Sequence, residues 1–108
     1  MAIQNGRFFL YYEMSKVIII GAGPAGLASA GSLRKKNIPF VILEKSDTIA
    51  KSWVDHYDRL SLHTIKELSA LPHMPFPDDY PTYIPKNTLL DYYKNYCANF
   101  EIRPIFNA

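Results

Sequence analysis

The sequence of 108 residues predicts an α/β fold that begins with a strand, a helix and a second strand parallel to the first. An apolar run at residues 17–20 leads directly into the glycine motif of residues 21–26, and a helix-forming segment follows. A second apolar run, residues 40–43, ends in the acidic residue Glu44. After Glu44 this alternation stops, and a long segment follows in which prolines recur and aromatic residues are scattered. These parts, in this order, are typical of a βαβ unit.

The two strands are expected at residues 16–20 and 40–44. Both are continuous apolar runs, which is the pattern of strands covered on both faces of a sheet. The helix between them can cover one face only, and the rest of the sequence supplies no further strand–helix alternation. We therefore expect the N-terminal βαβ part of a Rossmann-like domain that is incomplete in this chain.

The first helix is expected at about residues 25–36, where Gly26, Ala30 and Leu33 fall along one side. Gly31 lowers its helix propensity by roughly 1 kcal/mol relative to alanine. The basic residues 34–36 in the last turn suit the negative end of the helix dipole, and we interpret them as a solvated helix end.

Each glycine of the motif has its own physical role. Gly21 lets the chain turn sharply out of the strand, Gly23 lets the backbone approach a pyrophosphate, and Gly26 lets the helix pack tightly against the strand. The N–H groups and the positive end of the helix dipole then face an anion. Pro24 suits a first helical turn, because the N–H that it lacks would have no partner there. The motif predicts a diphosphate site; the alternative is a tight turn that binds nothing.

Glu44 distinguishes among nucleotides. A carboxylate at the end of the second strand accepts hydrogen bonds from ribose hydroxyls and repels the 2′-phosphate of NADP. This site is therefore predicted to take FAD or NAD, and the motif alone leaves the choice between them open. The alternative is a strand-end acid that lies in solvent.

Residues 45–86 are expected to form one long irregular segment. Its aromatic and apolar side chains favour a loop packed against the core over a disordered one. Prolines rule out a helix or a central strand in its second half: Pro72, Pro75, Pro77, Pro81 and Pro85.

A second helix is predicted after this segment, with Thr88 and Asp91 as a capping box at its start. Residues 101–106, after the helix, are expected to approach a further strand. Apolar residues at helical spacing indicate the side of the helix that faces the core: Leu89, Tyr93, Tyr96, Cys97 and Phe100.

Composition limits the function classes. A net charge of +2 gives no case for binding nucleic acid, and no apolar run is long enough for a membrane span. Residues 1–14 are predicted to be an N-terminal extension, and residues 15–108 the partial domain.

The single cysteine, Cys97, excludes an internal disulfide and fits a reducing compartment, so we expect a cytoplasmic protein. Its place in the helix predicts a small buried side chain, not a nucleophile. No metal site is expected.

The chain resembles the flavin-containing monooxygenases, and within them the plant YUCCA group of indole-3-pyruvate monooxygenases. The resemblance runs from about residue 16 to the last residue. The motif GAGPAGLA is shared by many FAD enzymes, whereas IPFVILEK, SW, YDRLSLH, LPHMPFP and YPTY are more specific to the group. By position, the resemblance implies FAD contacts at these residues: Gly21, Ala22, Gly23, Pro24, Ala25, Gly26, Glu44, Lys45, Ser52, Trp53, His63 and Thr64. Taken alone, Trp53 fits a core tryptophan as well as a wall of a cofactor site, and His63 is more typical of an ordinary polar loop residue.

The same resemblance implies an activity. In this family NADPH reduces FAD, and oxygen is transferred to a small-molecule substrate. For the YUCCA group the implied reaction is oxidative decarboxylation of a 2-oxo acid, indole-3-pyruvate, to indole-3-acetate in auxin biosynthesis. The second glycine-rich motif, which binds NADPH in the family, is absent from this sequence. We therefore expect the chain to be inactive alone and assign no catalytic residue.

Two other functions stay open. One is a truncated, non-catalytic protein that binds a nucleotide weakly or only contacts other proteins. The other is a different FAD- or NAD-dependent oxidoreductase that shares the first motif. Among these, the disulfide reductases are disfavoured, since the sequence has no C-x-x-C pair.

Overall fold

The computed structural model describes residues 17–55 and 70–108 of the chain. The predicted extension, residues 1–14, lies outside the described residues, as do the YDRLSLH block and the predicted contacts His63 and Thr64.

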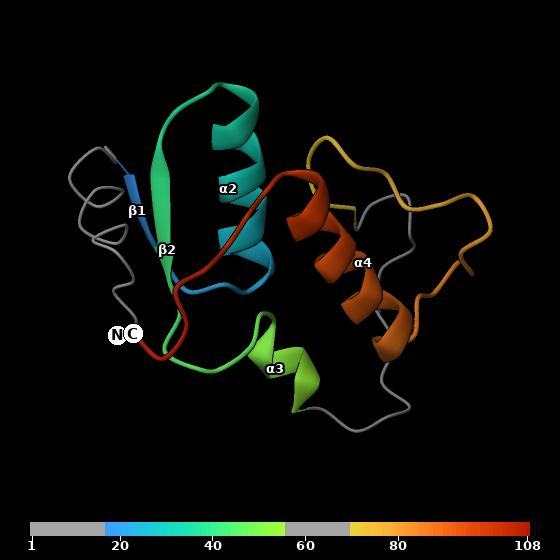
Figure 1. The fold of residues 1–108 in the computed structure, drawn as a ribbon. Coiled ribbons are helices and arrows are strands. Elements are labelled where there is room, and N and C mark those ends of the chain that lie inside the picture. The colour runs from blue at the N-terminus through green and yellow to red at the C-terminus, as the bar shows by residue number, and fades with distance from the viewer. Residues whose placement is uncertain (1–16, 56–69) are drawn as a thin grey trace.

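The described elements follow one another as predicted for a βαβ unit (Figure 1). β1 (Val17–Ile20) and β2 (Phe40–Leu43) are parallel neighbours in a sheet, and α2 (Pro24–Lys35) connects them. The register places Val17 beside Phe40, and Ile20 beside Leu43. Both strands thus end at the same edge, with the glycine motif directly after one and Glu44 directly after the other.

A third segment joins the sheet beside β2. Ile105 forms a parallel bridge with Leu43: its N–H donates to the carbonyl of Ile42 at 2.9 Å, and its own carbonyl accepts from the N–H of Glu44 at 2.9 Å. The prediction that residues 101–106 approach another strand is confirmed. The α/β fold class is confirmed with it, because the parallel β–α–β arrangement is present and extended.

α2 lies between the sheet and α4 (Lys86–Asn99), as Figure 1 shows. The predicted face of α2 is only part of its buried surface: Ala30 is fully buried, whereas Gly26 and Leu33 are half-buried. Leu27 and Gly31 are buried too, because α4 covers a second side of α2.

α4 starts earlier than predicted. Its first residue is Lys86, Pro85 occupies the N-cap, and no side chain caps the start. The capping box of Thr88 and Asp91 is therefore wrong. Thr88 lies inside the first turn, since the fixed φ of Pro85 and the complete burial of Ile84 before it set the helix start.

Two tyrosines of α4 hold residues 70–85, the proline-rich loop, against the core. The Tyr92 hydroxyl accepts from the N–H of Leu71 at 2.9 Å and donates to the carbonyl of Met74 at 2.6 Å. The Tyr96 hydroxyl donates to the carbonyl of Pro72 at 2.9 Å. The prediction of a packed loop is confirmed for residues 70–85, in which Phe76 and Ile84 belong to the core.

Two further features differ from the sequence interpretation. α3 (Lys51–Val54), a single helical turn, lies within the segment predicted to be irregular. Arg34 is not simply a solvated residue at a helix end: its guanidinium donates to the carbonyls of Phe100 and Glu101, each at 3.0 Å. Arg34 thereby ties the end of α2 to the end of α4, where a positive charge suits the helix dipole.

Two side chains on the second face of β1 are exposed. Ile18 is 43% exposed and Ile20 is 79% exposed, while Ile19 between them packs against the core. α2 therefore covers one face of this strand, as the sequence analysis expected for a single helix. Within the described residues, no helix has both the length and the apolar character that a membrane span requires.

Candidate nucleotide-binding site

The glycine motif has the geometry that its spacing predicts. Gly21 has a φ of +98°, a conformation open to glycine and strained for other residues. A Cβ at Gly26 would collide with the carbonyl oxygen of Gly21, so only glycine lets α2 start this close to β1. A Cβ at Gly23, in contrast, would meet nothing within 4 Å. Two glycines therefore serve the fold, and the third borders open space.

This open space lies at the N-terminus of α2. Gly23 is the N-cap, and its carbonyl accepts from the N–H of Leu27 at 2.9 Å. No side chain caps this helix start, and no acidic residue lies in its first turn. The positive end of the helix dipole is thus not neutralised by a side chain of this turn, which favours an anion there.

Glu44 is buried at the same edge of the sheet, with 8% of its surface exposed. One carboxylate oxygen accepts from the N–H of Ala22 and the other from the N–H of Ser46, each at 2.8 Å. These two hydrogen bonds hold the pKa of Glu44 below its usual value, with Ala22 the largest cause. Glu44 is therefore an ionised, buried acceptor, and the alternative of an acid in solvent is wrong.

A hollow of about 380 Å³ lies beside Glu44, at the carboxyl ends of β1 and β2. Ligands of open α/β sheets bind outside the carboxyl ends of the strands. The hollow also borders the glycine motif, since Gly21 is one of its lining residues. Six residues line the hollow: Ile20, Gly21, Leu43, Glu44, Lys45 and Ala108.

Within the described residues, further predicted contacts lie in the glycine motif, directly after Glu44 and on α3. Lys45 is exposed at the hollow, and Ala22, inside the glycine motif, is fully buried. α3 is attached to the loop, because the N–H of Ala50 donates to the carbonyl of Ala22 at 2.9 Å. On α3, Ser52 is exposed, and Trp53 is half-buried against the hydrophobic core. Their contacts with a cofactor stay a prediction.

Two residues outside both the predicted strands and the predicted contacts also lie at this edge. Ser46 donates its N–H to Glu44, and Ala108 lines the hollow. For Ser46 there was a signal, because an acidic side chain often accepts from the N–H two residues later in a turn. For Ala108 there was none, since its place depends on the third segment of the sheet.

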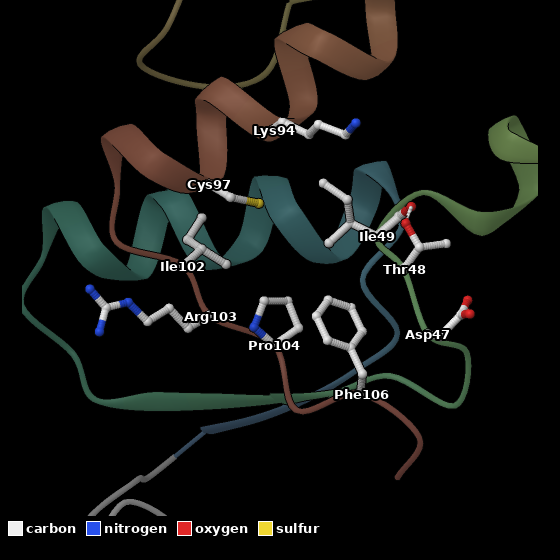
Figure 2. Close-up of a pocket in the computed structure, with 9 residues that line it drawn as sticks. All are labelled: Asp47, Thr48, Ile49, Lys94, Cys97, Ile102, Arg103, Pro104 and Phe106. Atoms are coloured by element: carbon white, nitrogen blue, oxygen red, sulfur yellow. Dashed lines mark hydrogen bonds between the residues drawn. The ribbon is translucent and has the colours of Figure 1, made fainter. Parts of the chain in front are cut away.

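A second hollow, of about 400 Å³, lies between α4, residues 47–49 and the tail after α4 (Figure 2). Cys97 points into it from α4 beside Ile102 (Figure 2). Burial raises the pKa of the Cys97 thiol to about 11, so the thiol is neutral near pH 7. A neutral, half-buried thiol supports the packing role predicted for Cys97. Among the described residues, no group of His, Cys, Asp and Glu side chains could hold a metal ion.

Comparison with known proteins identifies the family. The family described as pyridine nucleotide-disulphide oxidoreductase matches residues 18–107. The chain belongs to this family. A probable indole-3-pyruvate monooxygenase of Arabidopsis thaliana, YUCCA8, is 50% identical over 91 residues, which are 83% of this chain and 21% of that protein. The resemblance to the YUCCA group is thus confirmed, and the chain spans about a fifth of the length of these relatives.

Solved structures share the fold. The flavin-containing monooxygenase of Stenotrophomonas maltophilia has a TM-score of 0.73 and 25% identity, over 82% of this chain and 27% of that one. The bacillithiol disulfide reductase of Bacillus cereus has a TM-score of 0.78 and 27% identity, over 86% of this chain and 28% of that one. Both likenesses extend well beyond the glycine motif.

Proposed function

We propose that the chain forms the part of an FAD site that holds the adenosine diphosphate, in a YUCCA-like flavin-dependent monooxygenase. One observation carries this proposal: the uncapped start of α2 and the buried carboxylate of Glu44 lie at the same sheet edge, beside a hollow. A dinucleotide needs a partner for its diphosphate and one for its ribose, and these two groups supply both chemistries.

The residues have distinct proposed roles. Gly23 gives the diphosphate access to the N–H groups at the start of α2, where the helix dipole stabilises its charge. Glu44 accepts from the ribose hydroxyls, since each of its oxygens has a second lone pair beyond the one that a backbone N–H occupies. The further contacts rest on the resemblance alone: Lys45, Ser52, Trp53, His63 and Thr64.

The activity is proposed for a protein with the length of these relatives, of which this chain spans about a fifth. Bound FAD would supply the redox and oxygen chemistry, with NADPH as the reductant. The proposed reaction is oxidative decarboxylation of an indole-3-pyruvate-like 2-oxo acid, supported by the 50% identity to a probable indole-3-pyruvate monooxygenase. Because the sequence holds one G-x-G-x-x-G motif, we propose that this chain binds FAD without turning over substrate.

A ligand series tests the nucleotide site. The purified chain is titrated with FAD, FMN, NAD and NADP, and binding is followed by the quenching of flavin fluorescence or by calorimetry. FAD should bind and FMN should not, because FMN lacks the adenosine diphosphate. NAD should bind more tightly than NADP, since Glu44 repels the 2′-phosphate. Equal affinity for FAD and FMN would contradict the proposal.

A further inference from the structure

The carboxylate of Glu44 connects two segments that are distant in the sequence. One oxygen accepts from Ala22, inside the glycine motif, and the other from Ser46, in the turn after β2. Both donors are backbone N–H groups at 2.8 Å, and Glu44 as a whole residue is 8% exposed. A buried N–H group that loses its acceptor carries a desolvation cost, so the buried bond from Ala22 restrains its backbone most, and the half-buried bond from Ser46 adds to the restraint.

The backbone around this carboxylate is also bound to the end of the chain. The carbonyl of Glu44 accepts from the N–H of Ala108 at 3.1 Å, and that of Ser46 from the N–H of Asn107 at 2.9 Å. The N–H of Glu44 donates to the carbonyl of Ile105. The side chain of Glu44 thus links the glycine motif to the turn after β2, which hydrogen bonds to the third segment already hold in place.

The glycine motif needs such a restraint more than other loops do. Glycines lose more backbone freedom on ordering than any other residue, and three of the six residues at 21–26 are glycines. A loop that is ordered before its ligand arrives avoids part of the entropic cost of binding.

We propose that Glu44 is a positioning residue, which holds the glycine motif in its ligand-ready shape before a nucleotide binds. The nucleotide in this proposal rests on the proposed function, whereas the restraint on the loop does not. In this account Glu44 contributes to the diphosphate site indirectly, through Ala22, in addition to any contact with a ribose.

Amide exchange in the nucleotide-free chain tests the restraint. In Glu44→Gln, the amide has only one acceptor oxygen, and its NH₂ group faces one of the two N–H donors. Exchange should accelerate by roughly tenfold or more at the backbone amide that faces the new NH₂ group, because a hydrogen bond to a charged group is lost there. It should accelerate less at the other amide, whose acceptor becomes a neutral oxygen. Glu101→Gln is the matched control, because Glu101 is exposed and lies after α4, and it should leave both rates unchanged. Unchanged rates in Glu44→Gln would overturn the proposal.

Binding of inorganic pyrophosphate separates the indirect role from a ribose contact. Pyrophosphate has no ribose, and removing a negative charge would by itself strengthen its binding. The proposal predicts weaker binding in Glu44→Gln, and equal or tighter binding than in the wild-type chain would overturn it. If the wild-type chain binds neither FAD nor pyrophosphate, the proposed function fails, and amide exchange alone decides the role of Glu44.

One measurement needs no variant. In the nucleotide-free wild-type chain, NMR should detect a scalar coupling across the hydrogen bond between the Ala22 nitrogen and the Glu44 carboxylate carbon. Its presence would support the proposal even if Glu44→Gln did not fold. Its absence, with couplings detected at the backbone bonds of β1 and β2, would contradict it.

Discussion

Gly26 and Gly31 lie in the same helix and both allow close packing, but their partners differ. A Cβ at Gly26 would collide with the backbone carbonyl of Gly21, five residues away in the sequence. A Cβ at Gly31 would collide with the Tyr96 hydroxyl and ring, which α4 brings from much later in the sequence. Gly26 lets α2 pack closely against the end of β1, where the nucleotide site is proposed. Gly31 lets α2 pack closely against Tyr96 of α4, which also binds the proline-rich loop.

This difference decides how firmly each contact is fixed. The carbonyl of Gly21 belongs to the backbone, and the N–H of Gly21 donates to the carbonyl of Leu43 at 2.8 Å, so it cannot move without moving the sheet. The Tyr96 ring belongs to a side chain, which can shift at the cost of its bond to Pro72. Substitution should therefore be tolerated much less at Gly26 than at Gly31.

The largest effect is expected for Gly26→Ala. The new methyl group meets backbone on the β1 side, and relief requires α2 to move away from the sheet. We expect the free energy of unfolding to fall by about 3 kcal/mol or more, enough to unfold a small domain. Far-UV circular dichroism and a urea titration measure this. A variant as stable as the wild-type chain would show that the helix start adjusts freely.

Gly31→Ala should cost less. Its methyl group displaces the Tyr96 ring, at about 1–3 kcal/mol, while alanine recovers up to about 1 kcal/mol of helix propensity. Tyr96→Phe removes the hydroxyl that lies nearest, so the same substitution in that background should cost less. A double-mutant cycle in urea measures the coupling between the two positions. Additive effects would mean that Gly31 does not accommodate Tyr96.

The sequence analysis predicted Gly26 and missed the role of Gly31 for the same physical reason. A motif encodes contacts within one βαβ unit, where the spacing of the residues follows from the strand–helix–strand order, so Gly21, Gly26 and Glu44 could be assigned from spacing. Gly31 was interpreted only as a weak helix residue, because its partner Tyr96 is known only once α4 has packed.

Other differences also arise from tertiary contacts. Tyr92, left out of the predicted core side of α4, is almost fully buried because its hydroxyl binds the proline-rich loop. Arg34 looked solvated because its partners follow it by 66 and 67 residues. α3 is a single turn, too short to show a helical period. The capping box of Thr88 matched a local pattern, but the start of α4 is set at Pro85.

The α4 region should lose stability at alkaline pH. Burial, with a smaller contribution from Tyr92, raises the pKa of Tyr93 from 10.0 to about 12. Between these values the unfolded chain releases the proton while the folded chain keeps it, so the free energy of unfolding falls as pH rises. Tyr93→Phe should reduce this loss by about 1–2 kcal/mol, at about 1.4 kcal/mol for each unit of pKa. Urea titrations at pH 9 and 11 measure it, and equal slopes with pH in both proteins would contradict it.

Arg34→Ala should have the smallest effect. It removes two hydrogen bonds to the end of α4 and the contact of the guanidinium carbon with the Phe40 ring, 4.6 Å from its centroid. Because Arg34 is exposed, we expect a loss of about 0.5–1 kcal/mol, a shift of a few degrees in Tm. Lys35→Ala is the matched control and should change Tm less. A larger loss in the control would mean that the helix dipole alone, and not the carbonyl contacts, matters.

Gly23→Val tests most directly whether the end of β1 holds a diphosphate. A Cβ at Gly23 would meet nothing within 4 Å, and φ there is −81°, so the variant should fold within about 1 kcal/mol of the wild-type chain. Its side chain would fill the space predicted for the diphosphate. Calorimetric titration with FAD should therefore show binding by the wild-type chain and none by the folded variant. FAD binding of equal affinity in both would contradict the proposed site.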